Sequence, residues 1–196
     1  MAAKEHRVTV YFLTFLAGIC LGSFANVVIS RGPIWWGLAP SAHTDEVILT
    51  GPRSRCPHCG IQLKAWHLVP LLSWIALRGK CSACGAQIAL RYPLVELAGG
   101  LMAIGAVACW GWDLSAAIVF LAGMMILALG VIDAETGYLP DALTIPLILF
   151  GLGANAAGTY LAGFPRDDYE FLSAFPDAVI GAIAGYGVLA LLRLFY

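Results

Sequence analysis

Charged residues are scarce in this sequence. Of its 196 residues, 11 are Lys or Arg and 12 are Asp or Glu, so 12% are charged, while 60% are hydrophobic. Soluble globular domains carry about 25% charged residues, so this composition excludes an ordinary soluble domain and indicates a membrane protein. The net charge of −1 gives no basis for a nucleic-acid partner, and none is expected.

Several patterns of known functional classes are also absent. The sequence contains no internal repeat, no low-complexity tract and no glycine-rich turn of the Rossmann type between a strand and a helix. No apolar stretch carries a charge near its centre, which makes a transporter or channel subunit a weak hypothesis.

Five apolar stretches have the length of about 20 residues that a helix needs to span a bilayer. The predicted spans are residues 8–29, 94–111, 114–132, 142–162 and 177–196. Gly111-Trp112-Asp113 is a short predicted turn between the second and the third. No clear cleavage site follows the first stretch, so it is interpreted as a retained helix and not as a signal peptide.

Small residues inside these stretches are interpreted as packing positions. Gly18-x3-Gly22 and Gly181-x3-Gly185 have the spacing that lets two helices approach closely. Cys20 and Cys109 also lie in apolar runs, and they are expected to be small buried hydrophobic side chains, not metal ligands.

Two cysteine couplets lie in the polar segment after the first span. They are Cys56-Pro57-His58-Cys59 and Cys81-Ser82-Ala83-Cys84, each followed directly by a glycine. Two tight turns that each present two thiolates suit one tetrahedral zinc ion, and the glycine lets the backbone turn back. We therefore expect Cys56, Cys59, Cys81 and Cys84 to hold a structural zinc; His43, His58 and His67 are alternative ligands.

The cations indicate how the chain is oriented in the membrane. Seven of the 11 Lys and Arg residues lie between Arg31 and Arg91, so the positive-inside rule places the cysteine segment in the cytoplasm. This compartment is reducing, which favours metal ligation over disulfides. The expected fold is an all-α polytopic membrane protein of about five transmembrane helices, with a small cytoplasmic zinc-binding segment between the first two.

The loop between the third and fourth spans carries three carboxylates on the same predicted face. Asp133 follows an almost uninterrupted apolar run, and a carboxylate at the end of a membrane helix is costly unless it is hydrated, paired or functional. From the residues alone, a functional Asp133 and a helix-terminating Asp133 remain equally open. Asp141 is expected to be the N-cap of the next helix.

Four segments together resemble one known family, the type IV prepilin peptidases. Residues 22–31 read GSFANVVISR and are similar to the family's GSFxNVxIxR stretch, and residues 91–97 read RYPLVEL and are similar to its RYPxVE stretch. Residues 52–59, PRSRCPHC, with Cys81–Cys84 match its zinc segment, and residues 133–141, DAETGYLPD, match the loop whose first Asp is catalytic. With a weaker likeness at residues 177–181, the resemblance covers essentially the whole chain in order.

The resemblance implies a bifunctional enzyme of the bacterial inner membrane. Such an enzyme removes the short basic leader of type IV prepilins or type II secretion pseudopilins at the cytoplasmic face, and then methylates the new N-terminal amine with S-adenosylmethionine. Asp133 is then a catalytic residue of an intramembrane aspartic peptidase. The implied parts are a first transmembrane helix over 1–31, a zinc-binding, methyltransferase-associated segment over 32–92 and the peptidase helices over 93–196.

The sequence departs from the family at the second catalytic aspartate, which lies in a GxGD motif. Only Gly151-Leu152-Gly153 is similar, and Ala154 follows it. We expect this chain to be truncated before the motif and impaired as a peptidase on its own. Glu96, Glu135 and Asp141 are alternative second carboxylates on the expected face; the other face is expected to hold Asp113, Asp167, Asp168 and Asp177.

A non-catalytic function is the alternative hypothesis. A membrane protein with a zinc knuckle can bind a prepilin or another membrane client without any chemistry. The client, the residues of the methyl-donor site and the oligomeric state do not follow from the sequence.

Overall fold

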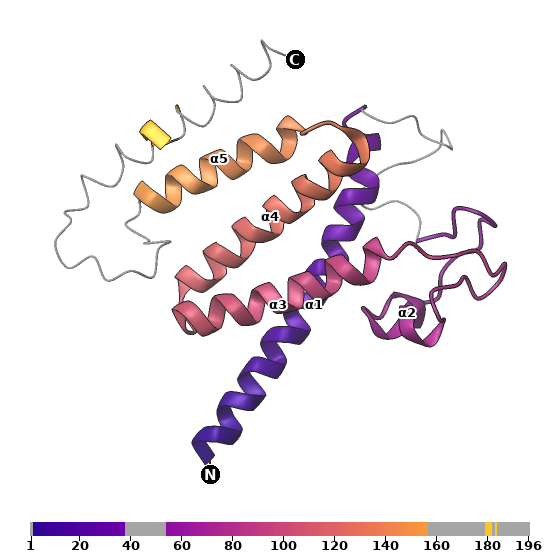
Figure 1. The fold of residues 1–196 in the computed structure, drawn as a ribbon, viewed down its shortest axis with the longest axis horizontal. Helices are drawn as coiled ribbons and strands as arrows, with labels where there is room; N and C mark the ends of the chain where they lie inside the picture. The colour runs from indigo at the N-terminus through magenta and orange to yellow at the C-terminus, as the bar shows by residue number, and fades with distance from the viewer. Residues whose placement is uncertain (1, 38–53, 157–178, 182, 184–196) are drawn as a thin grey trace.

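The computed structural model describes residues 2–37, 54–156, 179–181 and 183, and within them the chain is helical (Figure 1). The elements are α1 (Ala2–Trp35), the 3-10 helix η1 (Ala65–Leu68), α2 (Leu72–Ala76), α3 (Arg91–Trp110), α4 (Leu114–Thr136) and α5 (Asp141–Ala156). The expected all-α architecture is confirmed for these residues. Segments 38–53 and 163–176, nearly all of the predicted span 177–196, His43, Asp167, Asp168 and Asp177 lie outside the described residues.

Three of the described helices are long and apolar enough to cross a membrane. They cover Arg7–Trp35, Arg91–Trp110 and Leu114–Thr136, with 29, 20 and 23 residues. The first predicted span, 8–29, was too short at its C-terminal end, because the helix continues through Pro33 to Trp35. The predicted span 142–162 is described only as far as α5 reaches, and this part is a shorter apolar helix.

Glycines end two of these helices. Gly111 (φ +72°) follows α3, and Gly137 (φ +66°) follows α4 in the left-handed conformation, where its N–H donates to the Asp133 carbonyl. A left-handed residue at this position satisfies a carbonyl that the last helical turn leaves open. The predicted short turn around Gly111 is thereby confirmed.

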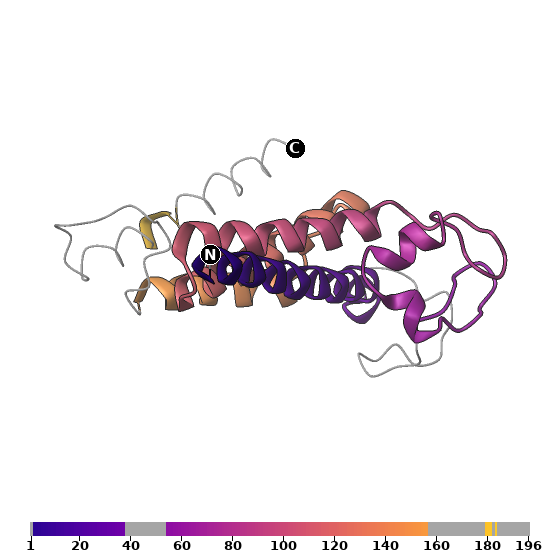
Figure 2. The same cartoon turned by 90° about the horizontal axis from the view of Figure 1, so that it is seen from below.

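The first glycine pair brings α1 and α3 into close contact, and the two helices cross each other in Figure 1, whereas Figure 2 shows them from the side. A Cβ on Gly18 would lie 2.5 Å from the Gly99 carbonyl oxygen, and one on Gly22 would lie 2.8 Å from the Glu96 Cα. Only glycine permits such an approach, so the packing interpretation of Gly18-x3-Gly22 is confirmed. Gly181 has no neighbour within 4 Å of an added Cβ, and Gly185 lies outside the described residues.

The apolar core joins α1, α3 and α4. It contains Ala25, Ile29, Val95, Met124, Ala128 and Ile132. Ile29 and Ile132 are 1% and 0% exposed, so the C-terminal turns of α1 and α4 are held together directly before Ser30 and Asp133. The expectation for Cys20 and Cys109 was wrong: both are exposed on their helices, because the seams against neighbouring helices lie on other faces.

One end of the helical bundle gathers four helix termini. The C-terminal ends of α1 and α4 and the N-terminal ends of α3 and α5 lie there (Figure 1). They lie beside residues 54–90, which carry the two couplets and are called the cysteine segment. Asp113 precedes the first residue of α4 and Asp133 lies in its last turns, so about 30 Å of helix separates them. The expected separation of these two carboxylates is confirmed.

Candidate functional site

The two cysteine couplets form two copies of the same local structure. In the first, the Gly60 N–H donates to the Cys56 carbonyl (2.9 Å) and the Cys56 N–H to the Ile61 carbonyl (3.0 Å). The second couplet repeats this pattern from Cys81 to Gly85 and Ala86. Both glycines are left-handed, with φ of +70° and +71°, and an added Cβ would touch nothing, so their role is conformational.

These two turns bring the four thiols together. The Sγ atoms of Cys56, Cys59, Cys81 and Cys84 all lie within 4.8 Å of one another, and those of Cys56 and Cys84 are 3.9 Å apart. Zinc bound to sulfur at about 2.3 Å in a tetrahedron requires sulfur–sulfur distances of about 3.8 Å. The cluster therefore fits a tetrahedral metal ion. His58 and His67 are not part of it; the His67 ring instead contacts the Trp66 ring, with the two ring planes tilted by 55°.

The thiols hold their protons unequally. Hydrogen bonds from the backbones of Cys84 and Ala83 lower the pKa of Cys81 to about 6. A backbone hydrogen bond at Ala86 lowers the pKa of Cys84, but desolvation and the neighbouring thiols outweigh it and raise this pKa to about 11. A thiolate therefore forms readily at one position of the cluster, and a divalent cation can replace the remaining protons.

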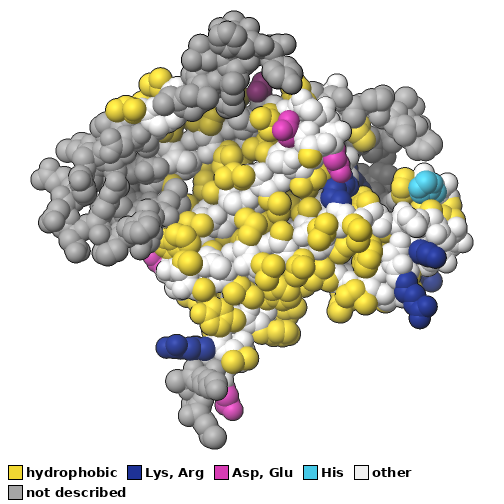
Figure 3. Space-filling view, viewed as in Figure 1, with side chains coloured by type: hydrophobic (Ala, Val, Ile, Leu, Met, Phe, Trp, Pro, Cys, Tyr) yellow, Lys and Arg dark blue, Asp and Glu magenta, His cyan; other side chains and the backbone are white. Residues whose placement is uncertain are grey.

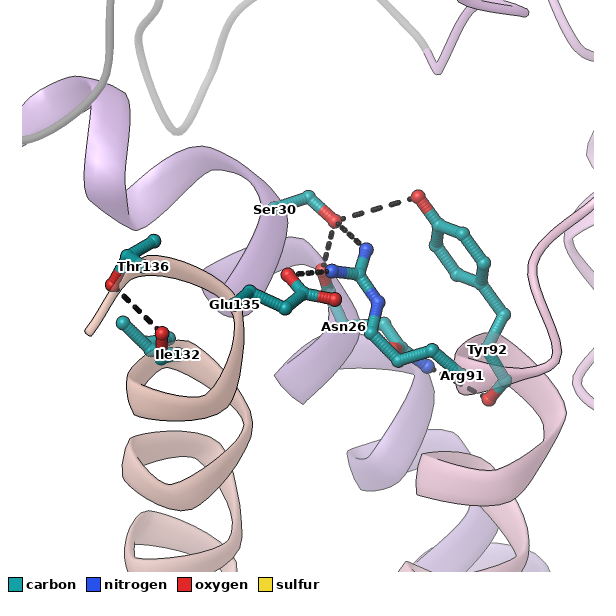
Figure 4. Close-up of polar contacts among 7 residues, drawn as sticks. All are labelled: Asn26, Ser30, Arg91, Tyr92, Ile132, Glu135 and Thr136. Carbon is teal, nitrogen blue, oxygen red and sulfur yellow. Dashed lines mark hydrogen bonds and ion pairs between the residues drawn. The ribbon is translucent and has the colours of Figure 1, made fainter. Parts of the chain in front are cut away.

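Arg91, the first residue of α3, connects three helices at this end (Figure 4). Its Nη1 donates to the Glu135 carboxylate on α4, and its Nη2 donates to Ser30 Oγ on α1 at 2.9 Å. Its guanidinium carbon lies 4.8 Å from the centre of the Tyr92 ring. One cation thus fixes the last turn of α4 relative to the start of α3.

Asn26 on α1 continues this network into the bundle (Figure 4). It is 3% exposed, and its Nδ2 donates to the Tyr92 carbonyl at 3.0 Å. Ser30 Oγ donates to the Asn26 carbonyl at 2.7 Å. The Asn26 Oδ1 and Arg91 Nε atoms are buried and have no hydrogen-bond partner among the described residues. An acceptor and a donor are therefore available to a further molecule, since such buried groups are normally paired.

Glu96 ties the cysteine segment to α3. This carboxylate is 8% exposed and accepts a hydrogen bond of 2.8 Å from the Leu71 N–H, directly before α2. Leu71 has φ +58° and ψ −50°, and the Leu72 N–H donates to the Pro70 carbonyl at 2.6 Å, so Leu71 is the centre of a γ-turn. This turn is strained for a residue with a side chain, and the Glu96 bond offsets part of the strain.

A cavity of about 650 Å³ lies between the cysteine segment and the ends of α1 and α3. Its wall includes Asn26, Ser30, Trp74, Arg91, Glu96 and Glu135. Cys56 and Cys81 also line it, so a folded cysteine segment is needed to close the cavity. Charged, amide and aromatic groups in one cavity suit a polar organic molecule that also carries an apolar part.

Asp133 is not in the wall of this cavity, although Glu135, in the same turn of α4, is. It is exposed, and its side chain makes no hydrogen bond or ion pair with the described residues. Of the alternative carboxylates, Glu135 pairs with Arg91 and Glu96 with Leu71. Asp141 is the first residue of α5, so it lies in the first helical turn and the N-cap expectation was off by one position.

Sequence reasoning on composition and spacing missed the network of Arg91, Glu96 and Asn26. The available signal was polar residues at the ends of apolar runs, within the two stretches GSFANVVISR and RYPLVEL. Their partners are 25 to 66 positions away in the chain, so no local pattern shows the pairing.

Comparison with known proteins gives two family matches. The family described as "Bacterial Peptidase A24 N-terminal domain" matches residues 16–110, and the "Type IV leader peptidase family" matches residues 118–196. No solved structure matches the chain.

Similar curated proteins carry the name "Prepilin leader peptidase/N-methyltransferase". The relative from Burkholderia pseudomallei (strain K96243) is 43% identical over 86% of this chain and 55% of its own length. Those from Stutzerimonas stutzeri and Neisseria gonorrhoeae are 40% and 36% identical, over 86% and 94% of this chain and 58% and 65% of their own lengths. The chain thus spans between half and two thirds of these relatives.

Proposed function

The chain belongs to the type IV leader peptidase family, and from this we propose that it acts in the removal of leader peptides from prepilins or pseudopilins and in methylation of the new N-terminus. The observation that supports this most directly is the juxtaposition at one end of the bundle. A cavity with unpaired buried polar atoms lies there, against the cysteine segment, beside the α4 turn that carries Asp133. Both reactions act on the same chain end, so neighbouring sites suit this function.

Asp133 is the proposed catalytic carboxylate of the peptidase. Hydrolysis needs one carboxylate that takes a proton from water and a second, protonated one that polarises the scissile carbonyl. Asp133 is exposed at the end of an apolar helix, where a peptide leaving the membrane can reach it. The second carboxylate has to come within contact distance. Of the three alternative carboxylates, Glu135 and Glu96 are held by bonds to Arg91 and Leu71, and Asp141 is the one without such a bond to a described residue.

The cavity is the proposed site of methyl transfer. S-adenosylmethionine would supply a methyl group from its sulfonium centre when bound, and residues of the cavity wall would hold the pilin amine in its neutral form beside it. The available Asn26 Oδ1 can accept a hydrogen bond from an amine, and the cations in the wall suit a carboxylate group. Zinc held by the four cysteines has a structural role in this proposal, because it folds a segment that has little apolar core. The segment 32–92 is accordingly the proposed methyltransferase part, on the cytoplasmic side of the bacterial inner membrane.

One reaction tests both activities. The purified chain is mixed in detergent with a prepilin and isotope-labelled S-adenosylmethionine, and the pilin N-terminus is read by mass spectrometry; a pilin with a free N-terminus reports methylation alone. We expect Asp133→Asn to lower the leader cleavage that the unaltered chain retains by at least about 100-fold, as for loss of a general base, and to leave methylation of the free N-terminus intact. Asp113→Asn, at the opposite end of α4, is the matched control.

Two outcomes contradict this proposal. Measurable leader cleavage that is equal in Asp133→Asn and in the unaltered chain would remove Asp133 from the mechanism. Binding of prepilin without cleavage or methylation by the unaltered chain would favour the non-catalytic binding function. That alternative has one supporting observation, because no described residue forms a hydrogen bond or an ion pair with the Asp133 side chain.

A further inference from the structure

Part of the cysteine segment has an exposed apolar surface, which we call the α2 strip. It consists of Trp66, Leu68, Val69, Leu72 and Ile75. Leu72 and Ile75 are 66% and 64% exposed, and they lie three residues apart on one face of α2. Apolar patches of this kind on an otherwise polar segment mark a surface that is covered by another molecule or by a membrane.

The anchor at Glu96 places this strip at the level of the membrane-spanning helices. Glu96 is five residues into α3, which is about 7 to 8 Å from the start of that helix, and it binds the backbone directly before α2. At the same level α3 exposes Leu94 and Leu97, on a helix that is long and apolar enough to cross a membrane. The α2 strip therefore lies close to the level along α3 at which that helix exposes apolar side chains.

Within residues 54–90, which carry the strip, the charged side chains are all positive, and the Glu96 carboxylate on α3 is bonded to the Leu71 N–H. Residues 54–90 contain four Lys or Arg residues and no Asp or Glu, and a divalent ion bound to four thiolates removes only part of this charge. Arg78 and Lys80 follow directly after α2, are exposed, and make no ion pair with a described residue. Figure 3 shows Lys and Arg side chains beside exposed hydrophobic ones at this end of the molecule. Cations next to exposed apolar side chains are typical of elements that lie in an anionic lipid headgroup layer.

We propose that the α2 strip lies in the headgroup region of the membrane that the helices span, with Leu72 and Ile75 toward the acyl chains and Arg78 and Lys80 on anionic lipid phosphates. This contact holds the part of the cavity wall that α2 forms against the bilayer, since Trp74 of α2 lines the cavity. The proposal depends on the membrane position of α3 and not on either catalytic activity, so it stands or fails separately from them.

Hydrogen–deuterium exchange of the metal-loaded full chain tests the charge part. The chain is placed in nanodiscs of phosphatidylcholine alone or with one quarter phosphatidylglycerol, and the peptide that contains Leu72–Ala76 is followed by mass spectrometry. One basic residue at an anionic surface contributes about fivefold to an equilibrium, so we expect at least about fivefold slower exchange with phosphatidylglycerol. The double variant Arg78→Gln/Lys80→Gln should remove this difference.

The matched control changes the same charge elsewhere in the segment. Arg55→Gln/Lys64→Gln removes two cations that precede η1 and α2 in the chain, so it should keep the lipid dependence. Equal exchange in both lipids for the unaltered chain, or loss of the dependence in both double variants, would overturn the assignment to α2.

A photo-reactive amino acid in place of Ile75 tests the apolar part and identifies the occupant. Adducts with lipid acyl chains support the proposal. Adducts with a second copy of the chain, with a client protein or with another segment of the same chain overturn it. The metal content of the variant shows that the cysteine segment is still folded, so a missing lipid adduct also counts against the proposal.

Discussion

Replacing Gly22 with alanine should separate α1 from α3, even though alanine is the better helix former. The added Cβ would lie 2.8 Å from the Glu96 Cα and 2.8 Å from the Val95 carbonyl oxygen, and backbone atoms cannot move aside as a flexible side chain can. Such overpacking costs about 1–3 kcal/mol, whereas the higher helix propensity of alanine returns about 1 kcal/mol. We expect a net loss of up to about 2 kcal/mol in the free energy of unfolding.

The same change should affect the site, because the Gly22 contact positions Glu96. A shift of α1 would also lengthen the bond from Asn26 to the Tyr92 carbonyl, four residues along α1. We therefore expect faster hydrogen exchange at Leu71, whose N–H donates to Glu96.

Gly105→Ala is the matched control, since it lies on α3 with no neighbour within 4 Å of an added Cβ. Its expected effect has the opposite sign, a gain of about 0.5–1 kcal/mol. Unfolding by sodium dodecyl sulfate in mixed micelles, followed by circular dichroism, measures both variants. A Gly22→Ala protein that is as stable as Gly105→Ala would refute the argument from close helix approach.

Three further predictions concern the metal cluster and the network at Arg91. Cys84→Ser should lower the bound zinc measured by elemental analysis, while Cys20→Ser, on the exposed face of α1, should leave it at the level of the unaltered protein. A double-mutant cycle of Arg91→Gln and Glu135→Gln measures the coupling of this pair in the free energy of unfolding. We expect about 0.2–1 kcal/mol, because Glu135 is exposed and water screens the pair. A coupling of zero would mean that this ion pair does not hold α4. Glu96→Leu should lower the free energy of unfolding by about 1–3 kcal/mol and should increase protease cleavage near Leu71, because it leaves the Leu71 N–H without its acceptor. Glu96→Gln keeps an acceptor and should cost less. Equal losses in the two variants would contradict the role given to this bond.

Local features of this protein were predictable from the sequence. The helices α3 and α4 follow the predicted spans 94–111 and 114–132 closely, because composition and length decide whether a segment spans a bilayer. The two couplets form tight turns with left-handed glycines. These turns were predictable because each is formed by a few residues that are neighbours in the sequence. The predictions for zinc as the bound ion and for Asp133 as the catalytic residue remain predictions.

Features that depend on neighbours far away in the chain were not predictable. The exposure of Cys20 and Cys109 depends on which face of each helix meets another helix, and apolar sequences on all sides do not show this. The extension of α1 beyond residue 29 was also not predictable, because this end of the helix packs against the core that Ile29 shares with α4, and Trp36 contacts the same core.

The sequence by itself determined that this is a helical membrane protein with a four-cysteine segment, because hydropathy and ligand spacing act over short stretches of chain. Only the tertiary structure decided that Arg91 meets Glu135 and Ser30, that Glu96 supports a strained turn at Leu71, and that a cavity lies between the cysteine segment and the bundle. For the contacts between α1 and α3, the physical reason is the close approach of these two helices at their glycines, which brings together polar groups that are more than 60 positions apart in the chain.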